Sequence, residues 1–134
     1  MSLPIAINTP HKTVVAANRD PAHTTSKALL DLPKRDGSRL VMVKYDAGVE
    51  GSAFDAVKQI QEQGVVHLDT VVANAAISNL YPLVKDAQRY DLLEHYRVNV
   101  LGPVELYQAT RDLLQKSVGK PIFAFLGSGA GALG

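Results

Sequence analysis

Short apolar runs that alternate with helix-length stretches constrain the fold of this chain more than any other feature. Four runs have the β-branched and aromatic composition of buried strands, at residues 12–17, 39–45, 68–73 and 121–126. The stretches between them carry apolar residues at helical spacing. Strands that alternate with helices form right-handed β-α-β crossovers and a parallel sheet. We therefore predict an α/β protein with a doubly wound parallel sheet. The third run, residues 68–73, has the near-continuous apolar character of a strand that is covered on both faces.

Local signals predict where the helices begin and which side they bury. Asp20 is expected to cap a helix whose first residue is Pro21, since proline is favoured at that position. A long helical stretch from about Asp86 is expected to kink or break near Gly102-Pro103. The helix after the second strand is expected to carry one apolar side, formed by Phe54, Val57 and Ile60.

Composition limits the function classes. A chain of 134 residues has room for one domain, and 46% hydrophobic residues, 20% charged residues and a net charge of +1 are typical of soluble proteins. We expect no nucleic-acid partner and no membrane partner, because no basic bias and no apolar run of spanning length occurs. Residues 1–7 lack the features of a signal peptide, so a cytoplasmic location is expected. The chain has no cysteine and its histidines lack metal-ligand spacing, so no metal is expected.

Polar and small residues follow each of the expected strands. In a doubly wound sheet, ligands bind at the carboxyl ends of the strands. The informative segments are therefore Asn18-Arg19, Asp46-Ala47, Asn74-Ala75-Ala76 and Gly127-Ser128.

Three segments of the chain resemble one family. Ala73-Asn74-Ala75-Ala76 is similar to the Asn-Asn-Ala-Gly motif of short-chain dehydrogenases/reductases, with alanine at 76 where glycine is usual. Residues 98–103 resemble the family's Val-Asn-x-x-Gly-x segment, and residues 125–128 resemble its serine loop. The resemblance runs from Lys12 onward and implies a Rossmann-like nucleotide-binding fold. Residues 66–76 are similar to fungal ketoreductases of polyketide pathways typified by norsolorinic acid reductase, which implies a role in fungal secondary metabolism.

The resemblance implies NADP as cofactor. Arg19 matches the arginine that binds a 2′-phosphate, and a guanidinium suits phosphate. NAD-preferring relatives have a carboxylate where this chain has the neutral Asn18. Asp46, followed by Ala47, matches the aspartate that accepts a hydrogen bond from the adenine amine.

Further roles follow from the same resemblance. Asn74 matches an asparagine that bridges strands, and Ala75 and Ala76 leave space beside the cofactor ribose. Asn99 corresponds to a proton-relay asparagine. Ser128 matches the catalytic serine, which holds the substrate carbonyl oxygen and stabilises the alkoxide. Each position also has a simpler interpretation: Arg19 in a surface turn, Asn99 at a helix kink, and Ser128 as one serine of a glycine-rich loop.

Two elements that the family needs are missing from the expected places. The family's general acid is a tyrosine with a lysine four residues later, shortly after the serine loop, and its glycine-rich turn should precede Lys12, whereas no glycine occurs before Gly37. A Tyr-x-x-x-Lys match at residues 81–85 precedes Ser128, and a Gly-x-Gly-x-x-Gly match fills residues 129–134. We interpret the first as a coincidence. The second is a weak match, and the alignment of Ser128 with the family serine explains its glycines as a flexible active-site loop. Residues 1–134 are thus predicted to form a single, partial nucleotide-binding domain, incomplete at both ends.

Three functions are compatible with these residues. The first is NADPH-dependent reduction of a ketone on a polyketide-like or other hydrophobic substrate. The second is a catalytically inactive, truncated remnant. The third is a non-enzymatic α/β binding module, which leaves the coincidence of Asn74, Asn99 and Ser128 unexplained. The helix around Asn99 resembles dimer-forming helices of the family, which is compatible with a homo-oligomer. An uncovered sheet edge predicts self-association of the isolated chain.

Overall fold

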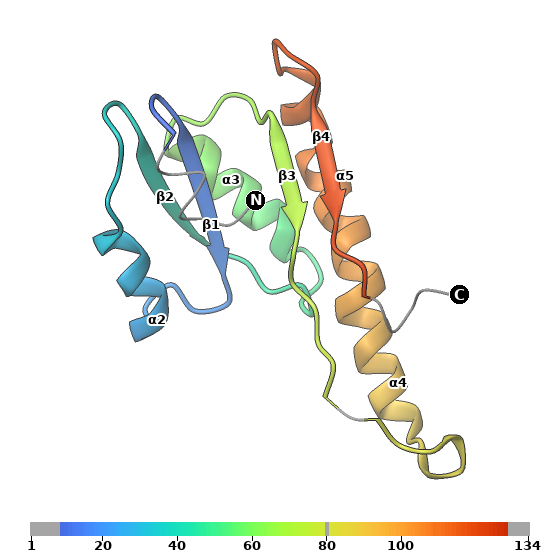
Figure 1. Cartoon of the computed structure of the whole chain (residues 1–134). Coiled ribbons are helices and arrows are strands. Elements are labelled where there is room, and N and C mark those ends of the chain that lie inside the picture. Colours follow the sequence, from blue (N-terminus) through green and yellow to red (C-terminus); the bar gives the residue numbers. More distant parts are fainter. Residues whose placement is uncertain (1–8, 80, 129–134) are drawn as a thin grey trace. The chain divides into compact units, whose positions relative to one another are not determined.

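The computed structural model describes residues 9–79 and 81–128. The chain divides into two compact units. The first contains residues up to Asp46 together with Asp55–Val65, and the second contains Ala47–Phe54 and the residues from Val66 onward. Each unit holds a pair of parallel strands (Figure 1).

In the first unit, β1 (Thr13–Asn18) pairs in parallel with β2 (Arg39–Lys44). The register runs from Thr13 opposite Arg39 to Asn18 opposite Lys44. Ala16 of β1 and Val41 and Val43 of β2 are buried, with Val43 only 2% exposed. The β-branched runs of the sequence therefore form the expected strands, because such residues pack well on a pleated surface.

The helix between β1 and β2 is shorter than predicted. Helix α2 spans Thr24–Lys27 and continues as the 3₁₀ turn Ala28–Asp31. Its N-cap is His23, whose Nδ1 accepts from the N–H of Thr25, so the prediction of Asp20 as cap and Pro21 as first residue is wrong. The Asp20 carboxylate instead accepts from the N–H of Ala22 at 2.9 Å, a local turn that competes with helix initiation.

Helix α3 (Ser52–Glu62) follows β2 and buries small residues. Ala53, Ala56 and Ile60 are 0%, 6% and 4% exposed, whereas Phe54 is 51% exposed. The expectation that Phe54 belongs to the buried side is therefore wrong. Alanines allow a helix backbone to approach its neighbours closely. Phe54 directly follows the buried Ala53 along the helix, so its side chain points in a different direction from the alanine side.

Two glutamines, one in α3 and one directly after it, cover the outer edge of β2. Gln59 accepts from the N–H of Lys44 at 3.1 Å and donates to its carbonyl at 3.5 Å. Gln63 donates to the carbonyl of Met42 at 3.5 Å. These side chains occupy backbone groups that a further strand would need, so the first unit keeps one strand edge closed.

In the second unit, β3 (Thr70–Ala73) pairs in parallel with β4 (Ile122–Phe125), from Thr70 opposite Ile122 to Ala73 opposite Phe125. After β3 come the 3₁₀ turn Val84–Asp86, helix α4 (Arg89–Tyr96), the π-helical segment Arg97–Leu101 and helix α5 (Gly102–Gln115). Figure 1 shows α4 and α5 following one another as one rod. The predicted interruption near Gly102-Pro103 is confirmed, and it takes the form of a π-helical segment that ends where these residues begin.

Burial in the second unit is one-sided. Leu113 and Leu114 of α5 are 2% and 6% exposed, and the ring of Tyr107 packs edge-to-face against Phe123 with centroids 5.2 Å apart. Strand β3 alternates, with Val71 buried and Val72 40% exposed, so β3 is not covered on both faces within the described residues. Large apolar side chains also stay exposed along the α4–α5 rod, namely Tyr90, Leu93, Tyr96, Val100 and Val104.

The parallel strands and intervening helices agree with the predicted α/β class. The expectation of one domain stays a prediction. Within residues 9–79 and 81–128, no helix combines the length and the apolar character needed to cross a bilayer.

Candidate functional site

Asn18 ends β1 and Arg19 follows it directly. The carbonyl of Asn18 accepts from the N–H of Tyr45 at 2.9 Å, so the segment that leads to Asp46 continues beside the end of β1. The Asn18 Nδ2 atom is buried and has no hydrogen-bond partner among the described residues. Arg19 is exposed and Asp46 is half-buried. This end of the first unit thus presents an amide donor that lacks an acceptor, next to a guanidinium.

The second unit contains residues 47–51 of the loop between β2 and α3. Ala47 is buried, and a Cβ atom on Gly102 of α5 would lie 2.8 Å from the carbonyl oxygen of Ala47. Such a distance is too short for any side chain, so glycine at 102 allows α5 to lie directly on the loop. Glu105 accepts from the N–H of Gly51 at the other end of the same loop, at 2.6 Å.

The ends of β3 and β4 place two further sets of predicted residues at one edge of their sheet. Asn74, Ala75 and Ala76 follow β3 and are exposed. The N–H of Leu126 donates to the carbonyl of Ala73 at 3.3 Å, which extends the pairing just past both strands. Ser128 lies two residues further along and is exposed. The backbone ladder therefore brings the asparagine-alanine segment and the serine segment to neighbouring strand ends.

Asn99 connects the π-helical segment to the loop after β3. Its Oδ1 accepts from the N–H of Ile77 at 2.8 Å, and its Nδ2 donates to the carbonyl of Ile77 at 2.8 Å. Short π-helical segments within α-helices occur frequently at functional sites. The carboxamide thus fixes the loop that begins with Asn74 to the helix.

His95 of α4 ties the same loop at a second point. Its Nε2 accepts from the N–H of Asn79 at 3.3 Å, and its Nδ1 lies 2.7 Å from the carbonyl oxygen of Asp91. His95 and Glu105 could not be found from the sequence, because no local pattern marks a side chain whose partner lies on a distant loop.

Comparison with known proteins identifies the family. The model of the short chain dehydrogenase family matches residues 6–134. The chain belongs to the short-chain dehydrogenase family. Norsolorinic acid ketoreductases of Dothistroma septosporum and Aspergillus parasiticus are 40% and 38% identical to it, over 89% of the chain in each case. The chain spans about half the length of such relatives, 45% and 44% for these two.

Solved structures agree on the fold. NADPH-bound carbonyl reductase from chicken fatty liver is similar with a TM-score of 0.68 at 24% identity, covering 81% of this chain and 45% of that one. Serine dehydrogenase from Escherichia coli is similar with a TM-score of 0.73 at 17% identity, covering 91% and 53%. The predicted Rossmann-like fold of the short-chain dehydrogenases is thereby confirmed.

The structure describes the first of the two motif matches and not the second. Tyr81 lies in the loop after β3, is 83% exposed and bonds its hydroxyl to Ser78. Lys85 belongs to the 3₁₀ turn that follows. The Gly-x-Gly-x-x-Gly match at residues 129–134 lies outside the described residues.

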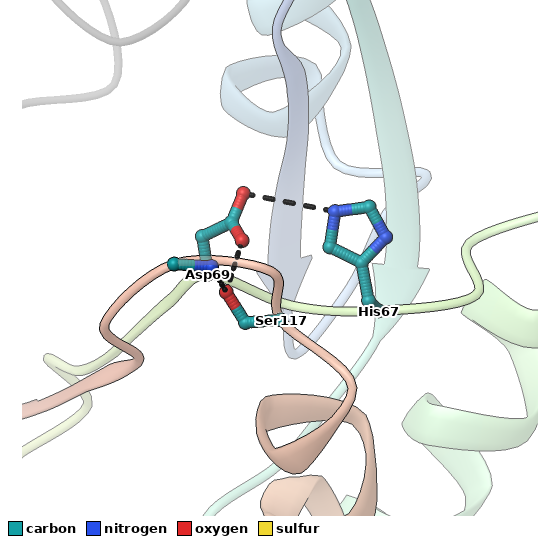
Figure 2. A network of polar contacts seen from close by, with 4 residues as sticks. His67, Asp69 and Ser117 are labelled. Carbon is teal, nitrogen blue, oxygen red and sulfur yellow. Dashed lines mark hydrogen bonds and ion pairs between the residues drawn. The ribbon is translucent and has the colours of Figure 1, made fainter.

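A serine, a histidine and an aspartate also meet in the second unit (Figure 2). Ser117 donates to Asp69 Oδ1 at 2.6 Å, and His67 Nε2 lies 3.8 Å from Asp69 Oδ2. A hydrolytic triad needs the histidine between the serine and the acid. Here the acid is in the middle, next to the beginning of β3, so the contacts tie the α5–β4 connection to β3 and do not activate a nucleophile.

An apolar hollow borders Asn99. Its volume is about 410 Å³, and it lies between the helical rod and β4. The lining residues are Asn99, Val100, Pro103, Val104, Tyr107, Phe123 and Phe125. Asn99 is the lone amide of that lining, and its carboxamide is already engaged with Ile77.

Proposed function

We propose that this short-chain dehydrogenase chain serves NADPH-dependent reduction of a ketone on a polyketide-like or other hydrophobic substrate. The names of the norsolorinic acid ketoreductases support the reaction type and the substrate class. When bound, the nicotinamide cofactor supplies the hydride. The chain's own residues bind the nucleotide and hold the carbonyl.

One observation carries the choice of NADPH: β1 ends with the neutral Asn18, and the guanidinium-bearing Arg19 follows it directly. Asn18 Nδ2 is buried without an acceptor among the described residues, and Arg19 is exposed beside it. A buried donor without a partner is costly, and a phosphate oxygen would satisfy it. The guanidinium of Arg19 would add charge-assisted hydrogen bonds to the same phosphate. A ribose hydroxyl alone would leave the positive charge uncompensated.

Other predicted residues complete the nucleotide contacts. Asp46 would accept from the adenine amine, with Ala47 lining the same part of the nucleotide. Ala75 and Ala76 would leave space for the ribose, and Asn74 would hold the end of β3. The small exposed side chains at 75 and 76 support that role, since a larger side chain would fill the space.

Ser128 and Asn99 would act on the carbonyl group. The hydroxyl of Ser128 would donate to the carbonyl oxygen and stabilise the negative charge that develops on it. Asn99 would belong to the proton relay, and its two hydrogen bonds to the backbone of Ile77 keep the carboxamide in one orientation. The cytoplasmic location and assembly into a homo-oligomer stay predictions.

The experiment compares ligands with and without a 2′-phosphate on the 134-residue chain. Calorimetric titration with NADPH, NADH and adenosine 2′,5′-bisphosphate measures each dissociation constant. We expect NADPH to bind more tightly than NADH. Replacing Arg19 by alanine should weaken NADPH binding roughly 10- to 100-fold, the value of a hydrogen bond to a charged group, and should leave NADH almost unchanged.

Arg35→Ala is the matched control, because Arg35 is also an exposed arginine of the first unit. It should leave both dissociation constants unchanged, which separates a local contact from a general loss of charge. Equal losses for NADPH and NADH in Arg19→Ala would contradict the NADPH assignment. Absence of binding by all three ligands would favour an inactive remnant over a functional nucleotide-binding chain.

A further inference from the structure

Helix α5 makes two contacts with the loop that joins β2 to α3. One is the close approach of Gly102 to Ala47, and the other is the hydrogen bond between Gly51 and Glu105. The two helix residues lie one turn apart on α5, and the two loop residues lie at the beginning and end of the loop. The loop is thus held at both ends by the same turn of helix.

The carboxylate of Glu105 is well suited to its partner. Gly51 precedes the first residue of α3 and has a positive φ of +82°, a backbone conformation that glycine adopts readily. Its N–H points at Glu105 Oε1, 2.6 Å away, and Glu105 is half-buried. A hydrogen bond from a backbone amide to a carboxylate is stronger than one between neutral groups, and the beginning of a helix favours a nearby negative charge.

The contact at Gly102 leaves little freedom. A Cβ atom at position 102 would lie 2.8 Å from the carbonyl oxygen and 2.9 Å from the Cβ atom of Ala47. Both distances are shorter than van der Waals contact, so the helix backbone itself rests on the loop. Residues Ala47–Phe54 accordingly belong to the compact unit that contains α5.

We propose that Glu105 is a positioning residue of the nucleotide site, which holds the loop 47–51 in the conformation that binds the adenine side of the cofactor. The inference rests on the proposed nucleotide-binding function, in which Ala47 lines that side. Without the Glu105 carboxylate, the Gly51 N–H loses its acceptor, and the end of the loop next to α3 loses its hydrogen bond to α5. The loop then samples other conformations, and the nucleotide has to select the competent one.

The test uses Glu105→Ala and the milder Glu105→Gln, which retains an acceptor oxygen without the charge. Glu94→Ala is the control, because Glu94 is an exposed glutamate on the preceding helix α4. Hydrogen exchange of the backbone amides reports loop motion in the absence of ligand. Calorimetric titration with adenosine 2′,5′-bisphosphate reports nucleotide affinity, and thermal unfolding reports overall stability.

We expect amide exchange at residues 47–51 to accelerate about ten-fold in Glu105→Ala and affinity for the bisphosphate to fall about ten-fold, as for a lost charge-assisted hydrogen bond. Glu105→Gln should restore most of both, and Glu94→Ala should change neither. A purely structural role predicts faster exchange throughout the second unit with the same affinity for the bisphosphate, and that result would overturn the proposal.

The outcomes also separate the positioning role from the proposed function. If the unmodified chain binds the bisphosphate and Glu105→Ala binds it equally well, the positioning role is wrong and the nucleotide site stands. If the unmodified chain does not bind the bisphosphate, the proposed function is wrong, and the positioning role falls with it.

Discussion

The carboxamide of Asn99 does for Ile77 what a neighbouring strand would do, because it satisfies both the N–H and the carbonyl of one residue. Each of the two hydrogen bonds is 2.8 Å long and partly buried. A loop has no ladder of its own, so a side chain has to supply these partners. One amide thereby gives an irregular segment the order of a paired strand.

Replacing Asn99 by alanine should destabilise the chain by about 1–3 kcal/mol, since two partly buried backbone groups would lose their partners. Thermal unfolding measures the loss, and hydrogen exchange at Ile77 locates it. Gln108→Ala removes an exposed amide from α5 and should leave both measurements unchanged. Equal stability of Asn99→Ala and the unmodified chain would show that water replaces the carboxamide at no cost.

At the scale of elements, each described strand pairs with one other strand, and the two outer edges of a pair differ in how many of their backbone groups already have partners. In the first unit, Gln59 and Gln63 occupy backbone groups along β2, whereas β1 pairs only with β2 among the described residues. A further strand could therefore join at β1 more readily than at β2. The glutamines act as a barrier to edge-to-edge association.

The double substitution of Gln59 and Gln63 by alanine should open the edge of β2. Gln59 lies in α3 and Gln63 follows the last residue of that helix. Alanine has a high helix propensity, so the change removes the amides and leaves the helix intact. We expect faster hydrogen exchange at Lys44, whose N–H loses its acceptor, and more aggregation on heating. Gln61→Ala, at an exposed position on the same helix, should change neither quantity.

The strands could be predicted from sequence because their signal is local. Thr13–Asn18 and Arg39–Lys44 are short runs of β-branched residues bounded by polar ones. The start of α2 was predicted wrongly, because the Asp20 carboxylate can cap a helix or close a turn, and only the chain beyond it decides between the two. Phe54 was predicted wrongly because periodicity does not distinguish a side of small residues from a side of large ones.

The residues that organise the candidate site were only partly visible from sequence. Asn99 and Ser128 were found by resemblance, and their roles stay predictions. The partner of Glu105 lies 54 residues away along the chain, so no sequence spacing connects the two. Contacts of that kind depend on how a loop folds over a helix, which no local pattern encodes.

At the scale of the whole molecule, much apolar surface stays exposed. Examples are Leu93 and Val104 on the α4–α5 rod, at 55% and 50%, and Ile122 and Phe125 on β4, at 51% and 59%. Exposed apolar surface of such extent marks an interaction surface or an aggregation hazard. The chain also spans only about half the length of its relatives.

We therefore expect the 134-residue chain to self-associate. Light scattering coupled to size-exclusion chromatography should give a mass above the 14.4 kDa of one chain, rising with concentration. Val104→Glu should lower the mass, while Gln108→Glu adds the same charge to α5 at a polar position and should leave it unchanged. A monodisperse monomer with cooperative unfolding would contradict the expectation.

The turns of helix between Asn99 and Glu105 span about 9 Å along the axis, at 1.5 Å for each residue. Asn99 forms hydrogen bonds with the loop after β3, while Gly102 and Glu105 contact the loop after β2. A short helical rod resists bending, so a displacement of the helix at Asn99 also displaces it at Gly102 and Glu105. The two loops are consequently coupled through the same stretch of helix, and a ligand that shifts one loop also shifts the other.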